Sequence, residues 1–479
     1  MKKRSLTENL FYNMLYQIIV TVLPIITIPY VTRTLGLHAN GIYSYTESIV
    51  TYFIIFGSLG TSLYGVRKVA YVCDEKEKLS KVTLEIIYLK LLLLLANLLI
   101  FIPLLCFNSP YADIYRIYII NIIANGIDVT WFYQGIEDFK KVTIRNLFVK
   151  FAYVISLFVF INEPDDLEKY VLIVVLSALI GNSIMLVSLP SHINMHIREK
   201  LHPLYHLKEC ILLFVPQVMN YVYALLDRSM LGWMTNTDNV TIYDQAQRLI
   251  RTITAILQSL GYVMMARIAN LKAGNDEEGM KYYIHKSADF TTFFSIPAVF
   301  GILGVANEFI PIFLGNEYVE SIPTLKLLSI LVLTIPFNGV LGTQILLPMG
   351  REKEYTFATI SGAITNILIN LILIPQIGIK GACVSSIVAE IVVFSVSAWH
   401  ARDLICIFDI VKRNLKVIFA AIVMFVFIQW VSYWQIGIVL KVIIKICGGG
   451  FIYFLLMLFW KNEILFSMIE KFFSLKTRK

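Results

Sequence analysis

The chain has 479 residues, of which 57% are hydrophobic and only 15% are charged, and its formal net charge is +8. A soluble protein carries about 25% charged residues, so this composition excludes a soluble enzyme or nucleic-acid-binding protein and predicts a polytopic membrane protein. The six cysteines show no CxxC or paired spacing, which favours small apolar filler over disulfide or metal chemistry.

Long apolar runs recur along the whole chain, and runs of this length are typical of membrane-spanning helices rather than of barrel strands. The basic N-terminus leads into a long apolar run without a small-residue cleavage site, so we expect a retained first span. The runs predict an all-α protein with about fourteen transmembrane helices, near residues 11–32, 42–64, 83–107, 114–134, 143–161, 170–189, 209–231, 242–265, 288–308, 322–347, 355–374, 380–400, 415–435 and 439–460.

The lysines and arginines between these spans predict the orientation of the chain. If the N-terminus is cytoplasmic, the inner connections and tails hold 30 of the 41 basic residues, and only five lie at outer ends. Basic residues concentrate in cytoplasmic loops, so we expect both termini in the cytoplasm.

The connections between spans are too short to fold as separate domains. The sequence has no GxxxxGK[ST], DxD or HExxH motif, so we expect neither an ATPase nor a membrane-bound transferase, and no cofactor. A transporter of this kind would depend on an ion gradient, the membrane potential or the gradient of its own substrate.

The predicted eighth span, within "YDQAQRLIRTITAILQSLGYVM" (243–264), carries three formal charges in an apolar setting. At helical spacing Asp244, Arg248 and Arg251 share a stripe with Gln247, Thr254 and Gln258. An intramembrane charge costs about 2.5–3.5 kcal/mol or more, so this stripe is expected to line a watery cavity or to pair with other charges. An intrahelical pair between Asp244 and Arg248 is the alternative reading.

Polar residues also recur at helical spacing in other spans, which predicts further cavity-facing stripes. Prolines within spans predict bends of the kind that suit a transporter with two alternating openings. The predicted lining residues are Asn13, Gln17, Asn121, Asn125, Gln217, Asn220, Asn366 and Asn370.

Seven charges from spans 1, 2, 7 and 8 fall at similar outer depth if the orientation above holds. We expect them to form a cationic outer vestibule whose acid–arginine pairs close a gate, because arginine binds carboxylates and phosphates through two hydrogen bonds. Snorkelling of Arg33 and Arg228 to lipid headgroups is the alternative. The seven residues are Arg33, Glu47, Asp227, Arg228, Asp244, Arg248 and Arg251.

Two further acids lie deeper in predicted spans, Asp128 towards the inner side and Glu390 near the middle of the twelfth span. Each is a candidate for ion coupling, and helix–helix hydrogen bonding is an equal alternative. Lys90, Lys326 and Lys445 lie near span ends, where we expect their ammonium groups to reach the lipid headgroups.

The two halves of the chain carry faintly similar segments about 200 residues apart, such as "TRTLGLHANGIYSYTES" after the first span and "DRSMLGWMTNTDNVTIYDQAQRL" after the seventh. This predicts a parallel repeat of two six-helix lobes. We expect lobes at 1–207 and 208–403, followed by a two-helix segment and tail at 404–479.

Three stretches resemble bacterial polysaccharide-biosynthesis flippases of the Wzx type, a family of the multidrug/oligosaccharidyl-lipid/polysaccharide exporter superfamily. They are "IPYVTRTLGLHANGIYSYTESIVTYFIIFGSLGTSLYGVRKVA" (28–70), "LLDRSMLG" with "YDQAQRL" (225–232 and 243–249), and "GREKEYTFATISGAITNILINLILIPQIGIKGACVSSIVAE" (350–390). The resemblance implies two six-helix bundles in a V around a central cavity, plus two C-terminal helices.

The resemblance also implies the activity: movement of undecaprenyl-diphosphate-linked oligosaccharide between membrane leaflets by alternating access. It implies a cationic lumen, to which Arg33, Arg228, Arg248 and Arg251 would contribute, and as partners membrane lipid, a coupling proton or sodium ion, and a polymerase or glycosyltransferase. A multidrug-type small-molecule exporter and a flippase for peptidoglycan precursors remain alternatives.

Overall fold

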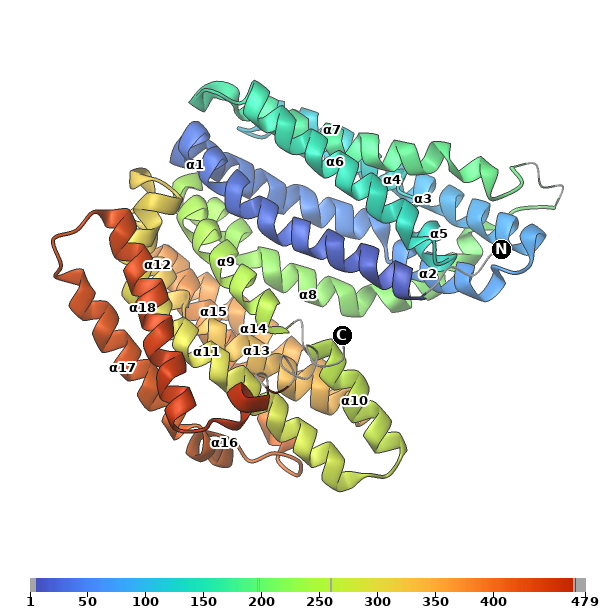
Figure 1. The fold of residues 1–479 in the computed structure, drawn as a ribbon. Coiled ribbons are helices and arrows are strands. Elements are labelled where there is room, and N and C mark those ends of the chain that lie inside the picture. The colour runs from blue at the N-terminus through green and yellow to red at the C-terminus, as the bar shows by residue number, and fades with distance from the viewer. Residues whose placement is uncertain (1–5, 196, 198, 259–260, 468–469, 471–479) are drawn as a thin grey trace. The chain divides into compact units, whose positions relative to one another are not determined.

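The computed structural model describes residues 6–195, 197, 199–258, 261–467 and 470, with side chains described except in 6–22, 215–224 and 262–263. Every regular element in this part of the chain is helical (Figure 1), which confirms the all-α prediction. The chain divides into two compact units, residues 1–229 and 230–479. The three-part division at 207/208 and 403/404 stays a prediction.

The first unit contains seven α-helices and most of an eighth, and short 3₁₀ turns join some of them. Their bounds are α1 Leu6–Ser58, α2 Thr61–Val72, α3 Lys76–Leu105, α4 Ala112–Gly126, α5 Thr130–Gly135, α6 Phe139–Phe160, η1 Pro164–Asp166, α7 Leu167–Val187, η2 Leu189–Ser191, η3 Pro203–His206 and α8 Leu207–Met234.

The α1 assignment joins two helices across a sharp break at Gly36. This residue has φ 72° and ψ −178°, a conformation that only glycine adopts readily. The break falls between the predicted first and second spans. The sequence therefore indicated the turn correctly, although helical hydrogen bonding resumes directly after the glycine and leaves no loop.

Two large apolar clusters lie within the described part of the first unit. One joins α1, α3, α4, α6 and α7 around Phe101, Tyr115 and Leu157, and the other surrounds Trp131 and Phe132 near α2 and α5. Each of these side chains is at most 1% exposed. The apolar residues on the outside of the helices are left for lipid, as expected of a protein whose surrounding solvent is hydrocarbon.

In its described part, the second unit contains ten further α-helices after the end of α8, together with one 3₁₀ turn and one π-helix. Their bounds are α9 Thr237–Gln258, α10 Gly261–Ala273, α11 Glu277–Phe313, η4 Asn316–Tyr318, α12 Ser321–Leu328, α13 Leu331–Gly339, the π-helix η5 Val340–Leu346, α14 Glu352–Ile377, α15 Ile379–Ala401, α16 Ile407–Arg413, α17 Leu415–Ser432 and α18 Ile438–Phe459.

The last two long helices, α17 and α18, pack against each other and against α11 (Figure 1). Lys445 on α18 is 1% exposed, and its Nζ donates to Glu308 Oε1 at 2.5 Å and to the carbonyl of Gly304 at 3.1 Å. The expectation that this lysine reaches the headgroups is therefore wrong. A buried carboxylate on α11 offers it a partner, and burial with that partner avoids an unpaired charge.

Ten helices among the described residues are long and apolar enough to cross a membrane. The multi-pass prediction is confirmed, and the count of fourteen stays a prediction. The first two predicted spans share one continuous helical segment, Leu23–Val72. Three others are not counted: 114–134 is split into α4 and α5, and the predicted spans 209–231 and 242–265 are only partly described.

Ion pairs join connections that the charge distribution predicts on the same side of the membrane. Arg351 donates to both carboxylate oxygens of Asp403, at 2.8 and 2.6 Å. Lys81 lies 2.5 Å from Glu199. These contacts agree with the predicted alternation of inner and outer connections. That the inner side is the cytoplasm stays a prediction.

Candidate functional site

The first unit places a row of polar side chains from α1 against the end of α8. Arg228 on α8 is 9% exposed, and its Nη1 lies 3.3 Å from Glu47 Oε2. Tyr43, one turn before Glu47, donates its hydroxyl to Oε1 of the same carboxylate at 3.2 Å. Ser229 donates to Ser48 at 3.2 Å. The predicted acid–arginine partnership between spans 2 and 7 therefore exists as a contact.

The other two charges of this unit that we assigned to the vestibule differ in their exposure. Arg33 is exposed and lies three residues before the break at Gly36. Asp227 is 6% exposed, beside Arg228 on α8. Because one is open and the other is enclosed, they have different access to water or a ligand.

The second unit holds the remaining three charges on α9. Arg248 Nε donates to Asp244 Oδ2 at 2.8 Å, and the Asp244 side chain is 5% exposed against 33% for Arg248. Arg251 is exposed. The alternative reading of Asp244 and Arg248 as an intrahelical pair is thus geometrically satisfied, and Arg248 still presents part of its guanidinium outward.

The predicted stripe on α9 faces more than one neighbour. Gln247 donates to the hydroxyl of Tyr243 at 2.8 Å, and that hydroxyl contacts Ser386 on α15 at 2.8 Å. Gln247 and Thr254 are buried, whereas Arg251 is exposed. The stripe therefore contains buried residues, with Asp244 among them, and the two more accessible arginines Arg248 and Arg251. The single vestibule of seven charges stays a prediction.

Asp128 lies in the break between α4 and α5. Its Oδ1 accepts from the backbone nitrogen of Thr130 at 2.9 Å and from the Thr130 hydroxyl at 2.5 Å. Its carbonyl oxygen accepts from Lys90 Nζ at 2.7 Å and from Trp131 Nε1 at 3.0 Å. Lys90 is 3% exposed, so the expectation that it reaches the headgroups is wrong. The Lys90 ammonium donates to the Asp128 carbonyl, a backbone group at the helix break that has no partner within a helix.

The same break is braced by α6 and α7. Arg145 donates to the Thr130 hydroxyl at 2.6 Å, and Asn182 donates to the carbonyl of Ala124 at 2.7 Å. Of the two asparagines that we predicted as lining residues on α4, Asn121 and Asn125 are half-buried. Asn125 borders a cavity of only about 10 Å³, so Asn125 faces a space of roughly one water molecule here.

Glu390 on α15 is 9% exposed and is held by α13. Asn338 donates its amide to the carboxylate and, at 3.1 Å, to the backbone carbonyl of Glu390. Asn338 lies two residues before the start of the π-helix η5, a geometry that is frequent at functional sites. Both the helix–helix hydrogen bond and the ion-coupling role that we predicted are compatible with this arrangement.

Asn366 and Asn370 lie in the contact between α14 and α15. Both are fully buried. Asn366 donates to Ser385 at 3.1 Å, the Ser385 hydroxyl donates back to the Asn366 carbonyl at 2.8 Å, and Asn370 donates to Asn366 at 3.2 Å. These bonds join two helices, and a cavity-lining role for the pair stays a prediction. The other predicted lining residues, Asn13, Gln17, Gln217 and Asn220, lie outside the side chains that the structure describes.

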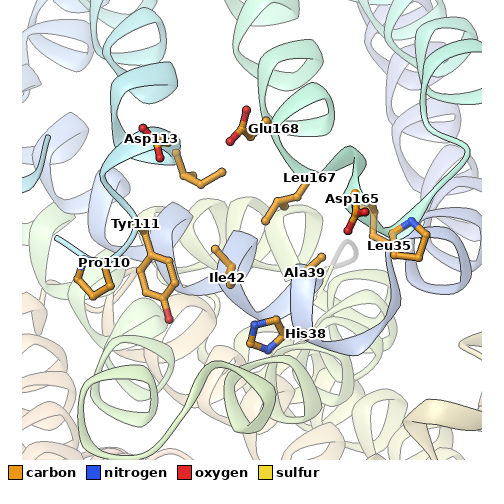
Figure 2. Close-up of a pocket in the computed structure, with 12 residues that line it drawn as sticks. Leu35, His38, Ala39, Ile42, Pro110, Tyr111, Asp113, Asp165, Leu167 and Glu168 are labelled. Carbon is orange, nitrogen blue, oxygen red and sulfur yellow. The ribbon is translucent and has the colours of Figure 1, made fainter.

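A cavity of about 400 Å³ opens at one end of the first unit (Figure 2). Its walls come from three segments that the charge distribution predicts on the outer side, at 35–42, 110–114 and 164–168. Figure 2 shows Asp113, Glu168 and Asp165 around it, with Tyr111 and His38 on the opposite wall. The shared cavity supports the placement of these three connections at one end of the unit.

Sequence reasoning missed several functional candidates that the structure shows. Lys90 and Lys445 could have been found, because a charge inside a long apolar run is a functional candidate in itself. Arg145 and Asn338 gave no such signal. Their importance depends on which helix they face, and spacing along one helix does not determine its neighbours.

The chain is similar to known membrane transporters over most of its length. Its residues 6–270 match the family described as "Polysaccharide biosynthesis protein", and residues 213–372 match the MatE family. A solved structure titled as the inward-facing conformation of a multidrug resistance MATE family transporter of the MOP superfamily has a TM-score of 0.62 and 13% identity, and the match covers 76% of this chain and 94% of that one.

Two curated relatives have sequence similarity over most of their own length. One, from Escherichia coli K12, bears the name "Putative O-antigen transporter" and is 23% identical over 84% of this chain and 98% of its own. A relative of the same name from Shigella dysenteriae is 25% identical over 77% of this chain and 93% of its own.

The helical elements define a multi-pass membrane protein whose fold is that of the solved MOP-superfamily transporter. The chain belongs to the polysaccharide biosynthesis protein family, whose model covers more than half of it. The resemblance found in the sequence is therefore confirmed.

Proposed function

We propose that this protein is a flippase that moves undecaprenyl-diphosphate-linked oligosaccharide repeat units from the inner to the outer leaflet of a bacterial cytoplasmic membrane. The family membership and the names of the two relatives support this proposal. The cargo combines a long prenyl tail with a charged and hydrophilic head. The tail can remain in lipid throughout, so only the head requires a polar route.

The observation that carries the proposal is the nearly buried Arg228, which faces Glu47 from the neighbouring helix α1. Moving a diphosphate through a hydrocarbon layer about 30 Å thick is very costly without compensation. A guanidinium replaces water around phosphate oxygens through paired hydrogen bonds. Arg248 and the exposed Arg33 and Arg251 would add positive charge along the route. Glu47 and Asp244 would hold arginines until cargo arrives.

The cycle needs no covalent chemistry and no cofactor, and alternating access of the two lobes would perform it. A proton or sodium gradient is the proposed energy source, with Asp128 and Glu390 as candidate coupling groups. Both termini are proposed to be cytoplasmic. Membrane lipid surrounds the protein, and a polymerase or glycosyltransferase would supply or consume the repeat unit.

The test is a strain that lacks this protein. Lipid-linked oligosaccharides are extracted and their membrane leaflet is determined with a membrane-impermeant glycan-modifying reagent, alongside a complemented strain. Complete repeat units trapped on the inner leaflet, with surface polymer lost, are the expected result. Normal polymer without a trapped intermediate would contradict the proposal and would favour the small-molecule exporter, for which the buried acid Glu390 is the supporting observation.

A further inference from the structure

The connection between α7 and α8 is attached to α3 at three successive points. The backbone nitrogen of Asn194 donates to the Ser80 hydroxyl at 2.9 Å, and Lys81 forms an ion pair with Glu199 at 2.5 Å. Glu85 Oε1 then accepts from the backbone nitrogen of His202 at 3.0 Å. All of these residues belong to the first unit. The connection therefore follows α3 over more than one helical turn.

The third attachment point continues into a buried chain of side chains. The other oxygen of Glu85 lies 2.8 Å from His206 Nε2, and His206 Nδ1 lies 2.6 Å from the hydroxyl of Tyr64 on α2. Tyr64 is 1% exposed, His206 3% and Glu85 6%. This Tyr64–His206–Glu85 chain links α2, η3 and α3 immediately before α8 begins at Leu207.

The chain can hold one additional proton without losing a hydrogen bond between its members. When His206 is neutral, Nε2–H donates to the Glu85 carboxylate and Nδ1 accepts from the Tyr64 hydroxyl. When His206 is protonated, both ring nitrogens donate, and the Tyr64 oxygen becomes the acceptor on Nδ1. The contact with Glu85, a charge-assisted hydrogen bond while His206 is neutral, then becomes an ion pair in which both partners are charged.

We propose that Tyr64, His206 and Glu85 form a proton-binding site, and that proton uptake tightens the attachment of the α8 start to α2 and α3. In the neutral-histidine state the site carries the negative charge of the buried Glu85 carboxylate, and Lys81 on the same helix is a cation close enough to interact with it. The added proton cancels this charge in a low-dielectric region, which favours its uptake. The proton arrives at Nδ1 and remains on the imidazolium, so Tyr64 stays neutral and Glu85 stays a carboxylate.

The first turns of α8 pack closely against α2 beside this site, so a change at the site would be felt by α8. Gly60, at the start of α2, has φ 73°, and a Cβ there would lie 2.7 Å from the carbonyl oxygen of Cys210. Cys210 is itself fully buried. The first turns of α8 therefore rest directly on the α2 backbone. Because α8 also carries Arg228, a change in this attachment would act on the helix that bears a proposed cargo ligand.

Other charged or titratable groups surround the site and enter any interpretation of its pH response. The hydrogen bond from Lys81 lowers the pKa of Glu199, so the neighbouring ion pair stays charged across the neutral range. The groups near Tyr64 and His206 on the surrounding elements are Arg67 and Lys68 on α2, Tyr205 on η3, Glu209 and Cys210 on α8, and His202 in the connection.

Cys210 provides a reporter for the attachment that does not depend on cargo. In a full-length protein whose other five cysteines are replaced by alanine, we would measure labelling of Cys210 by N-ethylmaleimide in membrane vesicles without substrate. His206→Ala should raise the labelling rate by about tenfold, the factor that corresponds to 1.4 kcal/mol. His192→Ala is the matched control, because His192 lies in the same connection but stacks on Phe132 and Tyr133, and it should leave the rate unchanged.

Two variants test the proposed proton site. Each replaces one titratable side chain by an amide, which can still form hydrogen bonds but does not take up a proton. His206→Gln retains a donor to Glu85, and Glu85→Gln retains acceptors while removing the charge. Comparing each protein with His206→Gln at the same pH cancels the intrinsic pH dependence of the thiol. The wild type should label about threefold more slowly than His206→Gln near pH 6 and equally near pH 8.5.

A wild-type to His206→Gln ratio that is constant with pH, or one that Glu85→Gln leaves pH-dependent, would overturn the proton site. Unchanged labelling in His206→Ala would overturn the attachment itself. The inference does not rest on the proposed function. Failure of the leaflet experiment would leave these labelling results unaffected, and failure of the labelling results would leave the flippase proposal standing.

Discussion

Arg228 and Glu47 illustrate how one contact can serve either structure or transport. The pair is at the edge of burial, with side-chain exposures of 10% and 34%. Removing one partner of an enclosed pair leaves an uncompensated charge, so loss of function alone would not identify a ligand role. A structural role and a cargo-binding role of Arg228 predict different effects on export when the charge of Glu47 is removed.

If Arg228 binds the cargo, Arg228→Ala should reduce surface polymer about tenfold or more, and Arg228→Lys should restore only part of it, because an ammonium does not reproduce paired hydrogen bonds. Glu47→Gln should retain most export, since the guanidinium remains. The measurement is surface polymer per unit of membrane-inserted protein. Equal losses in Glu47→Gln and Arg228→Ala would assign the pair a structural role only.

At Asp128 the role of the negative charge can be distinguished from the role of the hydrogen bond to Thr130. Its carboxylate accepts from Thr130 beside the start of α5, whereas Lys90 contacts its backbone carbonyl. Asp128→Asn keeps the accepting oxygen, and Asp128→Ala removes it. For a purely local role, we expect Asp128→Asn to behave as wild type and Asp128→Ala to lose about 0.5–2 kcal/mol, as when a helix-capping side chain is removed.

Thermal stability in detergent measures the local role of Asp128, and export at several pH values and sodium concentrations measures coupling. If Asp128 couples an ion, Asp128→Asn should remain stable but lose the pH or sodium dependence of export. Retained dependence in this variant would reject the coupling role and leave the local one.

At the scale of elements, α14 and α15 form the closest helix pair in the second unit. A Cβ on Gly381 would lie 2.6 Å from the backbone carbonyl of Leu373. Small residues allow such close approach of helix backbones in membranes, where packing and interhelical hydrogen bonds replace the hydrophobic effect. The Asn366–Ser385 bonds depend on this approach.

Gly381→Ala should therefore destabilise the protein by about 1–3 kcal/mol, the usual range for overpacking. Gly301→Ala on α11 is the matched control, because nothing lies within 4 Å of its added Cβ. Melting temperatures of the two purified variants provide the comparison. Similar melting temperatures would show that α14 and α15 can separate without cost.

At the scale of the whole molecule, the orientation can be tested with native cysteines. Cys73 and Cys406 lie in connections that we predict on the cytoplasmic side, and both are at least partly accessible. Each can be retained as the sole cysteine. Asn108→Cys in a cysteine-free background supplies a reporter on the predicted outer side, where Asn108 is exposed.

A membrane-impermeant maleimide should label Asn108→Cys in intact cells and should reach Cys73 and Cys406 only in inside-out vesicles. The expectation follows from the 30 basic residues on the inner side. The reverse pattern would invert the orientation and with it the inner and outer assignments of every charge discussed above. Permeabilised cells, in which all three thiols react, provide the control for accessibility.

The sequence by itself determined the class of protein and its helical character, and it predicted a connection between the first two spans, where the structure places the break at Gly36. These features depend on local quantities: the length of an apolar run, the spacing of polar residues, and a residue type that tolerates positive φ. The same local reasoning predicts that Glu47 and Arg228 lie at similar depth, because orientation and position along a helix fix depth, and the contact between them agrees with this prediction.

Only the tertiary structure decided which polar residues serve as partners of one another. Lys90 binds the carbonyl of Asp128, Lys445 binds Glu308, and His206 links Tyr64 to Glu85 across 121 and 142 positions of sequence. The helical period fixes which side chains share a face, but the neighbour of that face depends on how several helices pack together. In hydrocarbon an unpaired charge is too costly to persist, so packing turned side chains expected to reach the membrane surface into buried contacts.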